Sequence, residues 1–210
     1  MNERDYWDDT ARGFAASGSP WGPGGHDSWK PNTAECMAVI RPAIDLAVKD
    51  SVRGRRPPRF LDLGCGIGRF SVAAALAFPK AKVIGVDVSP EMLAGARAVA
   101  ESAGVSVEWL LGDGANVPEV GAPLIVAWSV FMLQHVDNDT KASYIRQVGG
   151  MLAPGGVFRF QFCVGETHEF LAHRATTKEM VAACASSGLD VVTMETGLLH
   201  PEWVWITARK

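Results

Sequence analysis

The chain has 210 residues, of which 48% are hydrophobic and 20% charged, and its formal net charge is −3 at pH 7. This composition is typical of a soluble globular domain with a sizeable core, and the net charge argues against a nucleic-acid-binding surface. The apolar runs are strand-sized, so no membrane span fits, and no apolar signal core follows the charged N-terminus, which predicts a cytoplasmic protein.

Residues 1–52 differ in kind from the rest of the chain. After a short helical or irregular segment, residues 17–26 form a glycine- and proline-rich loop that contains Trp21, and Trp29 follows it. A helix is predicted from about residue 33 to residue 49. We expect these 52 residues to form an N-terminal lid and helix, and residues 53–210 to form the core of a single domain.

The stretch Phe60–Phe70 combines an apolar run carrying Asp62 with glycines at three alternate positions, Gly64, Gly66 and Gly68. It predicts a buried strand, a tight turn and the start of a helix, where a ligand comes against the backbone because no Cβ blocks it. A dinucleotide site would have the spacing G-x-G-x-x-G, whereas here the third glycine comes one residue early.

Two further strands with acidic residues at or just after their ends follow this loop. Val83–Asp87 predicts a buried strand, and Asp87 lies 23 residues after Gly64, close to the spacing of about 20 at which an acid meets a ribose in nucleotide-binding folds. A helix opens at Ser89, and a third strand over Val105–Leu111 leads to Asp113. Acids therefore stand at or near the ends of three successive strands, and the spacing of Asp87 is that of an acid that meets a ribose.

These motifs resemble those of the class I S-adenosylmethionine (SAM)-dependent methyltransferases. The resemblance implies that Asp87 accepts from both ribose hydroxyls, that Asp113 accepts from the adenine amino group, and that Ala115 offers a backbone N–H to the ring. It also implies a role for Asp62 at the glycine loop and the methionine amino group. The cofactor-binding residues that it implies are Asp62, Gly64, Cys65, Gly66, Gly68, Asp87, Val88, Met92, Asp113, Gly114, Ala115, Trp128 and Ser129.

The rest of the chain continues to alternate strands and helices. Strands are predicted at Pro123–Trp128 and Val157–Phe162, with a helix between them, and a capping box at Thr176 opens a last helix. Leu189–Met194 and Trp203–Ala208 then form an antiparallel hairpin. The predicted fold class is α/β, Rossmann-like and doubly wound, with a mostly parallel seven-stranded sheet whose last strand is antiparallel.

The acceptor end of the site is less clearly marked. An L-x-H-V stretch ending at Val136 is similar to one in many small-molecule methyltransferases, including those of quinone biosynthesis, and it places His135 at the rim. His135 is a candidate general base, and a structural role that bonds a backbone carbonyl is the alternative. Candidate acceptor contacts are Phe131, Trp21, Trp29 and His168; the two tryptophans form part of a closing lid or staple the segment to the core.

Motifs typical of other methyltransferase classes and of metal sites are absent from the sequence, which narrows the range of functions. No Asn/Asp-Pro-Pro-aromatic sequence follows the fourth strand, and no second acid cluster there suits magnesium. His168 and His173 have i,i+5 spacing, and the four cysteines form no C-x-x-C pair, so no metal site is expected. The leading function is SAM-dependent methyl transfer to oxygen or nitrogen, or to carbon, of a small molecule, by a monomer or homodimer without nucleic-acid or membrane partners. A SAM-dependent cyclase and a non-catalytic SAM-binding subunit are the alternatives.

Overall fold

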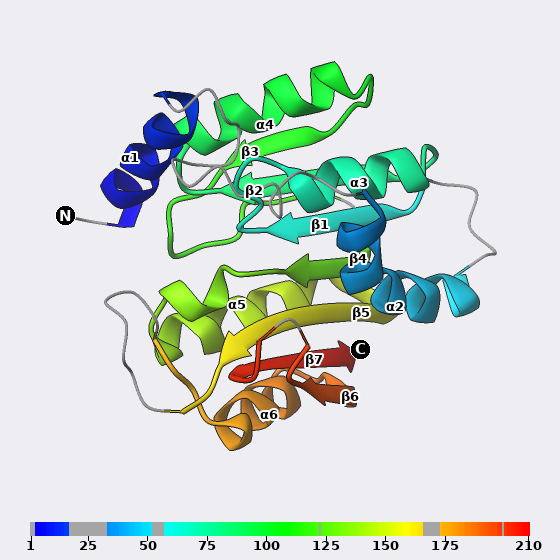
Figure 1. Ribbon diagram of the computed structural model, residues 1–210. Coiled ribbons are helices and arrows are strands. Elements are labelled where there is room, and N and C mark those ends of the chain that lie inside the picture. The colour runs from blue at the N-terminus through cyan, green and yellow to red at the C-terminus, as the bar shows by residue number, and fades with distance from the viewer. Residues whose placement is uncertain (1–2, 17–32, 52–56, 122, 166–172, 199) are drawn as a thin grey trace.

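The structure, a computed structural model, describes residues 3–16, 33–51, 57–121, 123–165, 173–198 and 200–210. One sheet runs through the molecule in the order β3-β2-β1-β4-β5-β7-β6 (Figure 1). The strands are β1 (Arg59–Leu63), β2 (Lys82–Asp87), β3 (Glu108–Leu111), β4 (Leu124–Ser129), β5 (Leu152–Cys163), β6 (Asp190–Thr196) and β7 (Trp203–Arg209). The helices are α1 (Glu3–Ala16), α2 (Thr33–Ser51), α3 (Arg69–Ala77), α4 (Pro90–Ser102), α5 (Asn138–Met151) and α6 (Thr177–Ser186).

The five strands from β3 to β5 pair in parallel, and β7 is antiparallel to both of its neighbours, β5 and β6. The predicted fold class is therefore confirmed, including the antiparallel last strand. In the parallel part of the sheet the strand order reverses between β1 and β4, because β2 and β3 lie to one side of β1. Ligands of such sheets bind outside the carboxyl ends of the strands at this reversal.

Helices cover both faces of the sheet, and the central strands are accordingly apolar on both sides. The face covered by α2 and α3 buries Ile40, Ile44, Phe60 and Trp128, while the face covered by α5 and α6 buries residues such as Ile145. The division of the chain at residue 52 stays a prediction, and α2 packs with α3 in one of the two core clusters.

Helix starts follow the local sequence. The Ser89 hydroxyl accepts from the Met92 amide at the start of α4, Asp137 caps α5, and Thr176 with Glu179 forms the predicted capping box of α6. Strand β5 begins at Leu152, five residues earlier than predicted, because the amide of Gly155 and the carbonyl of Gly156 bond the backbone of Lys210 and extend the ladder. Within the described ranges, no helix is both long and apolar enough to span a membrane.

Candidate functional site

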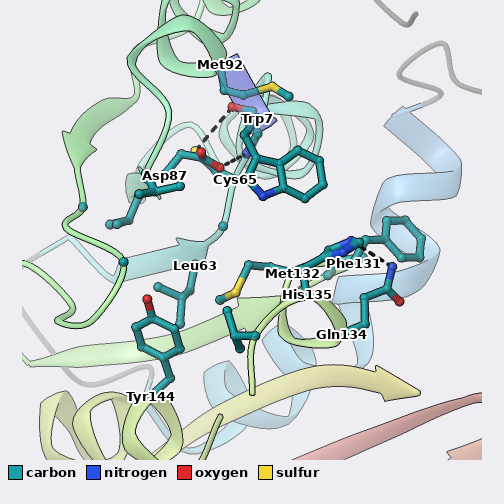
Figure 2. A pocket seen from close by; sticks show the side chains of 18 of the residues that line it. Trp7, Leu63, Cys65, Asp87, Met92, Phe131, Met132, Gln134, His135 and Tyr144 are labelled. Carbon is teal, nitrogen blue, oxygen red and sulfur yellow. Dashed lines mark hydrogen bonds between the residues drawn. The ribbon is translucent and has the colours of Figure 1, made fainter. Parts of the chain in front are cut away.

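A cavity of about 440 Å³ opens at the carboxyl ends of β1, β2 and β4, where the strand order reverses (Figure 2). It is lined by the glycine loop after β1, by Asp87 and Val88 at the end of β2, by the turn after β3, and by most of the segment 130–136 after β4. This volume lies in the range of small-molecule and cofactor sites. The predicted glycine loop and Asp87 therefore both lie at the wall of this cavity.

The glycine loop is tied to β2 by its backbone. The amides of Gly64 and Cys65 both donate to the carbonyl oxygen of Val86, at 2.8 and 2.9 Å. Gly64, Gly66 and Gly68 all have positive φ, between 53° and 79°, a conformation that side-chain-bearing residues rarely adopt. The alternate glycines are thus required by the turn itself, and they bring the backbone to the wall of the cavity.

Asp87 lines the cavity at the end of β2 and holds the loop on each of its carboxylate oxygens. Oδ2 accepts from the Gly66 amide at 2.7 Å, and Oδ1 accepts from the Ser89 amide at 3.0 Å. Each oxygen keeps further acceptor capacity for a hydroxyl group of a ligand. Burial raises the pKa of Asp87, and the amides of Ser89 and Gly66 oppose this shift by favouring the charged form.

Asp62 does not line the cavity. It is fully buried in β1, and its Oδ2 accepts from the Ser71 hydroxyl at 2.6 Å. Burial raises the pKa of Asp62 to about 7, because the charged form loses its hydration, and the bond from Ser71 opposes that shift. Its predicted contact with the methionine amino group stays a prediction.

The raised pKa of Asp62 predicts a pH-dependent stability. Between about pH 4 and pH 7 the folded protein holds a proton that the unfolded chain has already lost, so the free energy of unfolding should fall as the pH rises, by at most about 1.4 kcal/mol per pH unit. Asp62→Asn, which imitates the neutral acid, should remove this part of the decline. Urea unfolding of both proteins at pH 5 and pH 8 measures it, and identical pH dependence would contradict the assignment.

Asp113 also lies outside the cavity lining. Its Oδ1 accepts from the amides of Ala115 and Asn116 at 2.8 and 2.6 Å, and its Oδ2 accepts from the Asn116 side chain at 2.8 Å. These bonds lower the pKa of Asp113 to about 2. The acid shapes the turn after β3, and it is Gly114 and Asn116 of this turn that line the cavity.

Helix α1 lies across one side of the site, near α4 and the end of β2 (Figure 1). The Arg4 guanidinium donates to the Val88 carbonyl at 3.2 Å, and the Ser89 hydroxyl donates to Asp8. These contacts place the Trp7 ring edge-to-face against the His135 ring, with 4.9 Å between the centroids (Figure 2). Trp7 of the N-terminal segment therefore lines the cavity. The lid stays a prediction, and the predicted loop residues Trp21 and Trp29 lie outside the described residues.

Aromatic rings gather beyond β4. Phe131 has φ +62°, unusual for a residue with a side chain, and its ring lies 4.8 Å from Trp203 and 6.3 Å from Phe70 between centroids. Arg69, the first residue of α3, lines the cavity as well, and burial lowers the pKa of its guanidinium. This end combines a flat apolar surface with one positive charge, and His135 lies beside it (Figure 2).

The structure brings many of the predicted residues together and separates others. Those that line the cavity are Gly64, Cys65, Gly66, Asp87, Val88, Met92, Gly114, Phe131 and His135. Those that do not are Asp62, Gly68, Asp113, Ala115, Trp128 and Ser129. Trp128 and Ser129 are fully buried in the sheet, and His168 lies outside the described residues.

Sequence reasoning missed several lining residues, some beside the predicted motifs and others in distant elements. They include Trp7, Arg69, Phe70, Gln134, Tyr144 and Trp203. Arg69 could have been found, because it directly follows the third glycine of the loop. Trp7 and Trp203 carry no local signal, since only the tertiary fold brings the two ends of the chain to this cavity.

Known methyltransferases are similar to this chain in sequence. Residues 60–156 match the family described as "Methyltransferase domain". Trans-aconitate 2-methyltransferase of Methylobacterium radiotolerans is 38% identical over 122 residues, which are 58% of this chain and 43% of that protein. Demethylmenaquinone methyltransferase of Thermus thermophilus is 33% identical over 116 residues, covering 55% of this chain and 50% of that protein.

Among solved structures, magnesium protoporphyrin IX methyltransferase from Synechocystis, with SAH bound, superposes with a TM-score of 0.74 over 99% of this chain and 97% of that one. At 15% identity this likeness shows the fold, which is that of the Rossmann-like methyltransferases. Together with the match over residues 60–156 and the curated relatives, this likeness supports a class I SAM-dependent methyltransferase domain. The chain spans about half or less of the length of the two relatives named above.

Proposed function

We propose that this protein transfers a methyl group from SAM to an oxygen or nitrogen, or to a carbon, of a small molecule. The observation that carries the proposal is Asp87 at the wall of the cavity, anchored through both oxygens beside a glycine loop with no Cβ in the way. A carboxylate in this position suits the two hydroxyls of a ribose. The proposal includes a cytoplasmic monomer or homodimer with no nucleic-acid partner.

The residues of the cavity fit the parts of SAM. The turn at Gly114 and Asn116 offers a surface for adenine, Asp87 faces the ribose, and the glycine loop with Arg69 at the start of α3 meets the charged amino-acid end. The positive end of the α3 dipole favours a carboxylate there as well. The aromatic rings of Phe131 and Trp203 then border the space left for the acceptor.

Methyl transfer mainly requires that the methyl donor and the acceptor atom be held in the right relative position. When SAM is bound, it supplies an electrophilic methyl carbon: the lone pair of the acceptor forms the new bond while the C–S electron pair stays on sulfur. The residues of the site hold the two reactants in line at near-attack distance, exclude water and orient the acceptor atom. Trp7, Phe131 and Trp203 provide the walls that do this on the acceptor side.

Calorimetric titration with SAM, S-adenosylhomocysteine and NAD tests the cofactor assignment. We expect saturable binding of the first two and none of NAD. Incubation with SAM carrying a labelled methyl group and a panel of small carboxylic acids, phenols and amines then separates a methyltransferase from a binding subunit or a cyclase. Binding of NAD in place of SAM would overturn the proposal, and SAM binding without any methylated product would favour the non-methylating alternatives.

A further inference from the structure

A chain of hydrogen bonds runs from the backbone of the acceptor segment through two glutamines to His135. The Phe131 amide donates to Gln161 Oε1 at 3.2 Å, and Gln161 Nε2 donates to Gln134 Oε1 at 3.1 Å. Gln134 Nε2 lies 3.1 Å from His135 Nε2 (Figure 2). Gln161 is fully buried in β5, and the other members line the cavity.

The Phe131 amide fixes which group donates and which accepts along this series of hydrogen bonds. A backbone amide can only donate, so the atom of Gln161 that faces Phe131 must be the carbonyl oxygen. Gln161 then presents its NH₂ group to Gln134, whose facing atom must be its own carbonyl oxygen. The Cys163 thiol contacts the same oxygen of Gln134 at 3.2 Å as a donor, which opposes a flip of this amide.

The chemistry of His135 follows from that direction. Gln134 presents its NH₂ group to His135 Nε2, so Nε2 must accept and therefore carries no hydrogen. A neutral imidazole with a bare Nε2 has its hydrogen on Nδ1. Protonation at Nε2 would set two donors against each other, and a flip of Gln134 would break its bonds to Gln161 and Cys163.

We infer that Gln161 and Gln134 hold His135 as a neutral imidazole with its hydrogen on Nδ1, so that it does not remove a proton from the acceptor. This inference rests on the proposed methyl transfer. Gln134 and Gln161 are positioning residues, acting on the reaction through His135. Of the two roles predicted for His135, general base and structural, the geometry disfavours the first, because the Nε2 lone pair is already engaged.

A His135 that takes no proton also indicates the class of acceptor. An enzyme whose histidine takes no proton suits a nucleophile that arrives with an available lone pair, such as a carboxylate. One carboxylate oxygen forms the bond to the methyl carbon and the product is a neutral methyl ester, with no proton released.

Nitrogen-15 NMR of the imidazole rings tests the relay without any substrate. In the wild-type protein at pH 7 to 8, His135 should show a protonated Nδ1 and a bare Nε2, assigned through the signals missing in His135→Gln. Gln134→Glu keeps the shape but can only accept, so His135 should become protonated at Nε2. The same change at Gln147, which bonds Ala115 and Val117 and not His135, should leave the His135 signals in place.

A wild-type His135 protonated at Nε2, or the same tautomer in the wild type and Gln134→Glu, would overturn the relay. If Gln134→Glu fails to fold, Gln134→Leu, which removes the donor, should give a mixture of both tautomers, and an unchanged tautomer there would likewise contradict the relay. These spectra do not depend on SAM, whereas failure of SAM to bind would overturn the proposed function. The two failures are therefore distinguishable.

Turnover tests the acceptor class. In the labelled panel, methyl groups should enter the carboxylic acids and be released as methanol by mild alkali, as methyl esters require. Gln134→Glu should lower kcat about tenfold, the scale of one lost hydrogen bond, with the Kd for SAM unchanged. Alkali-stable label in phenols or amines, or no label in any acid, would contradict the carboxylate assignment.

Discussion

Asp87→Ala should weaken SAM binding at least about a hundredfold. Under the proposed function the Asp87 carboxylate accepts from two ribose hydroxyls, and a hydrogen bond to a charged group contributes about 1.5–3 kcal/mol. The same change leaves the amides of Gly66 and Ser89 without their acceptor, which loosens the glycine loop as well. Because burial raises the pKa of Asp87, SAM affinity of the wild type should also begin to weaken on acidification at a higher pH than an ordinary aspartate would give.

Calorimetric titration with SAM measures the effect of the Asp87 substitution. Asp190→Ala is the matched control, since this aspartate is exposed at the start of β6, away from the cavity lining. Asp87→Asn is a milder variant that keeps one acceptor oxygen. Its affinity for SAM should lie between the affinities of Asp87→Ala and Asp190→Ala. If Asp87→Ala remains folded by circular dichroism and binds SAM like the wild type, the ribose assignment is wrong.

The parts of the site that the sequence predicted well are those encoded over a few consecutive residues. The strand, turn and helix around Gly64–Gly68 need glycine at positive φ, so the requirement is visible in the letters themselves. Asp87 was found by its spacing from that loop, because in a βαβ unit the helix length fixes where the next strand ends. Both predictions place residues that line the cavity.

The predicted residues that the structure leaves outside the cavity share a different cause. Trp128 belongs to a strand buried on both faces, and an unbroken apolar run does not reveal which side chains point toward the ligand edge. Asp113 opens the sequence Asp-Gly-Ala-Asn, which is typical of a turn, and its carboxylate bonds the amides of that turn. Trp7 was missed because its partner His135 lies far along the chain, and no local pattern records such a contact.

Gly64→Ala should destabilise the folded protein by about 2–5 kcal/mol, whereas Gly66→Ala should cost only about 1–2 kcal/mol. Both positions have positive φ, +74° and +53°, and a left-handed conformation costs a residue with a Cβ roughly 1–2 kcal/mol. A Cβ on Gly64 would also lie 2.2 Å from Met132 Cγ and 2.4 Å from Met132 Cβ, and overpacking of this kind adds about 1–3 kcal/mol. A Cβ on Gly66 meets no atom within 4 Å.

Urea unfolding of the two variants separates backbone strain from the clash, since both introduce one methyl group. In double-mutant cycles, Met132→Gly, which removes both carbons that the new Cβ would meet, should offset part of the cost of Gly64→Ala and none of the cost of Gly66→Ala. Gly66 lines the cavity, so under the proposed function Gly66→Ala should fold but bind SAM more weakly, because a methyl group is added where the ligand meets the backbone. Equal stability of the two variants would contradict the packing of Met132 on Gly64. Wild-type SAM affinity in Gly66→Ala would contradict the close approach of the cofactor to this loop.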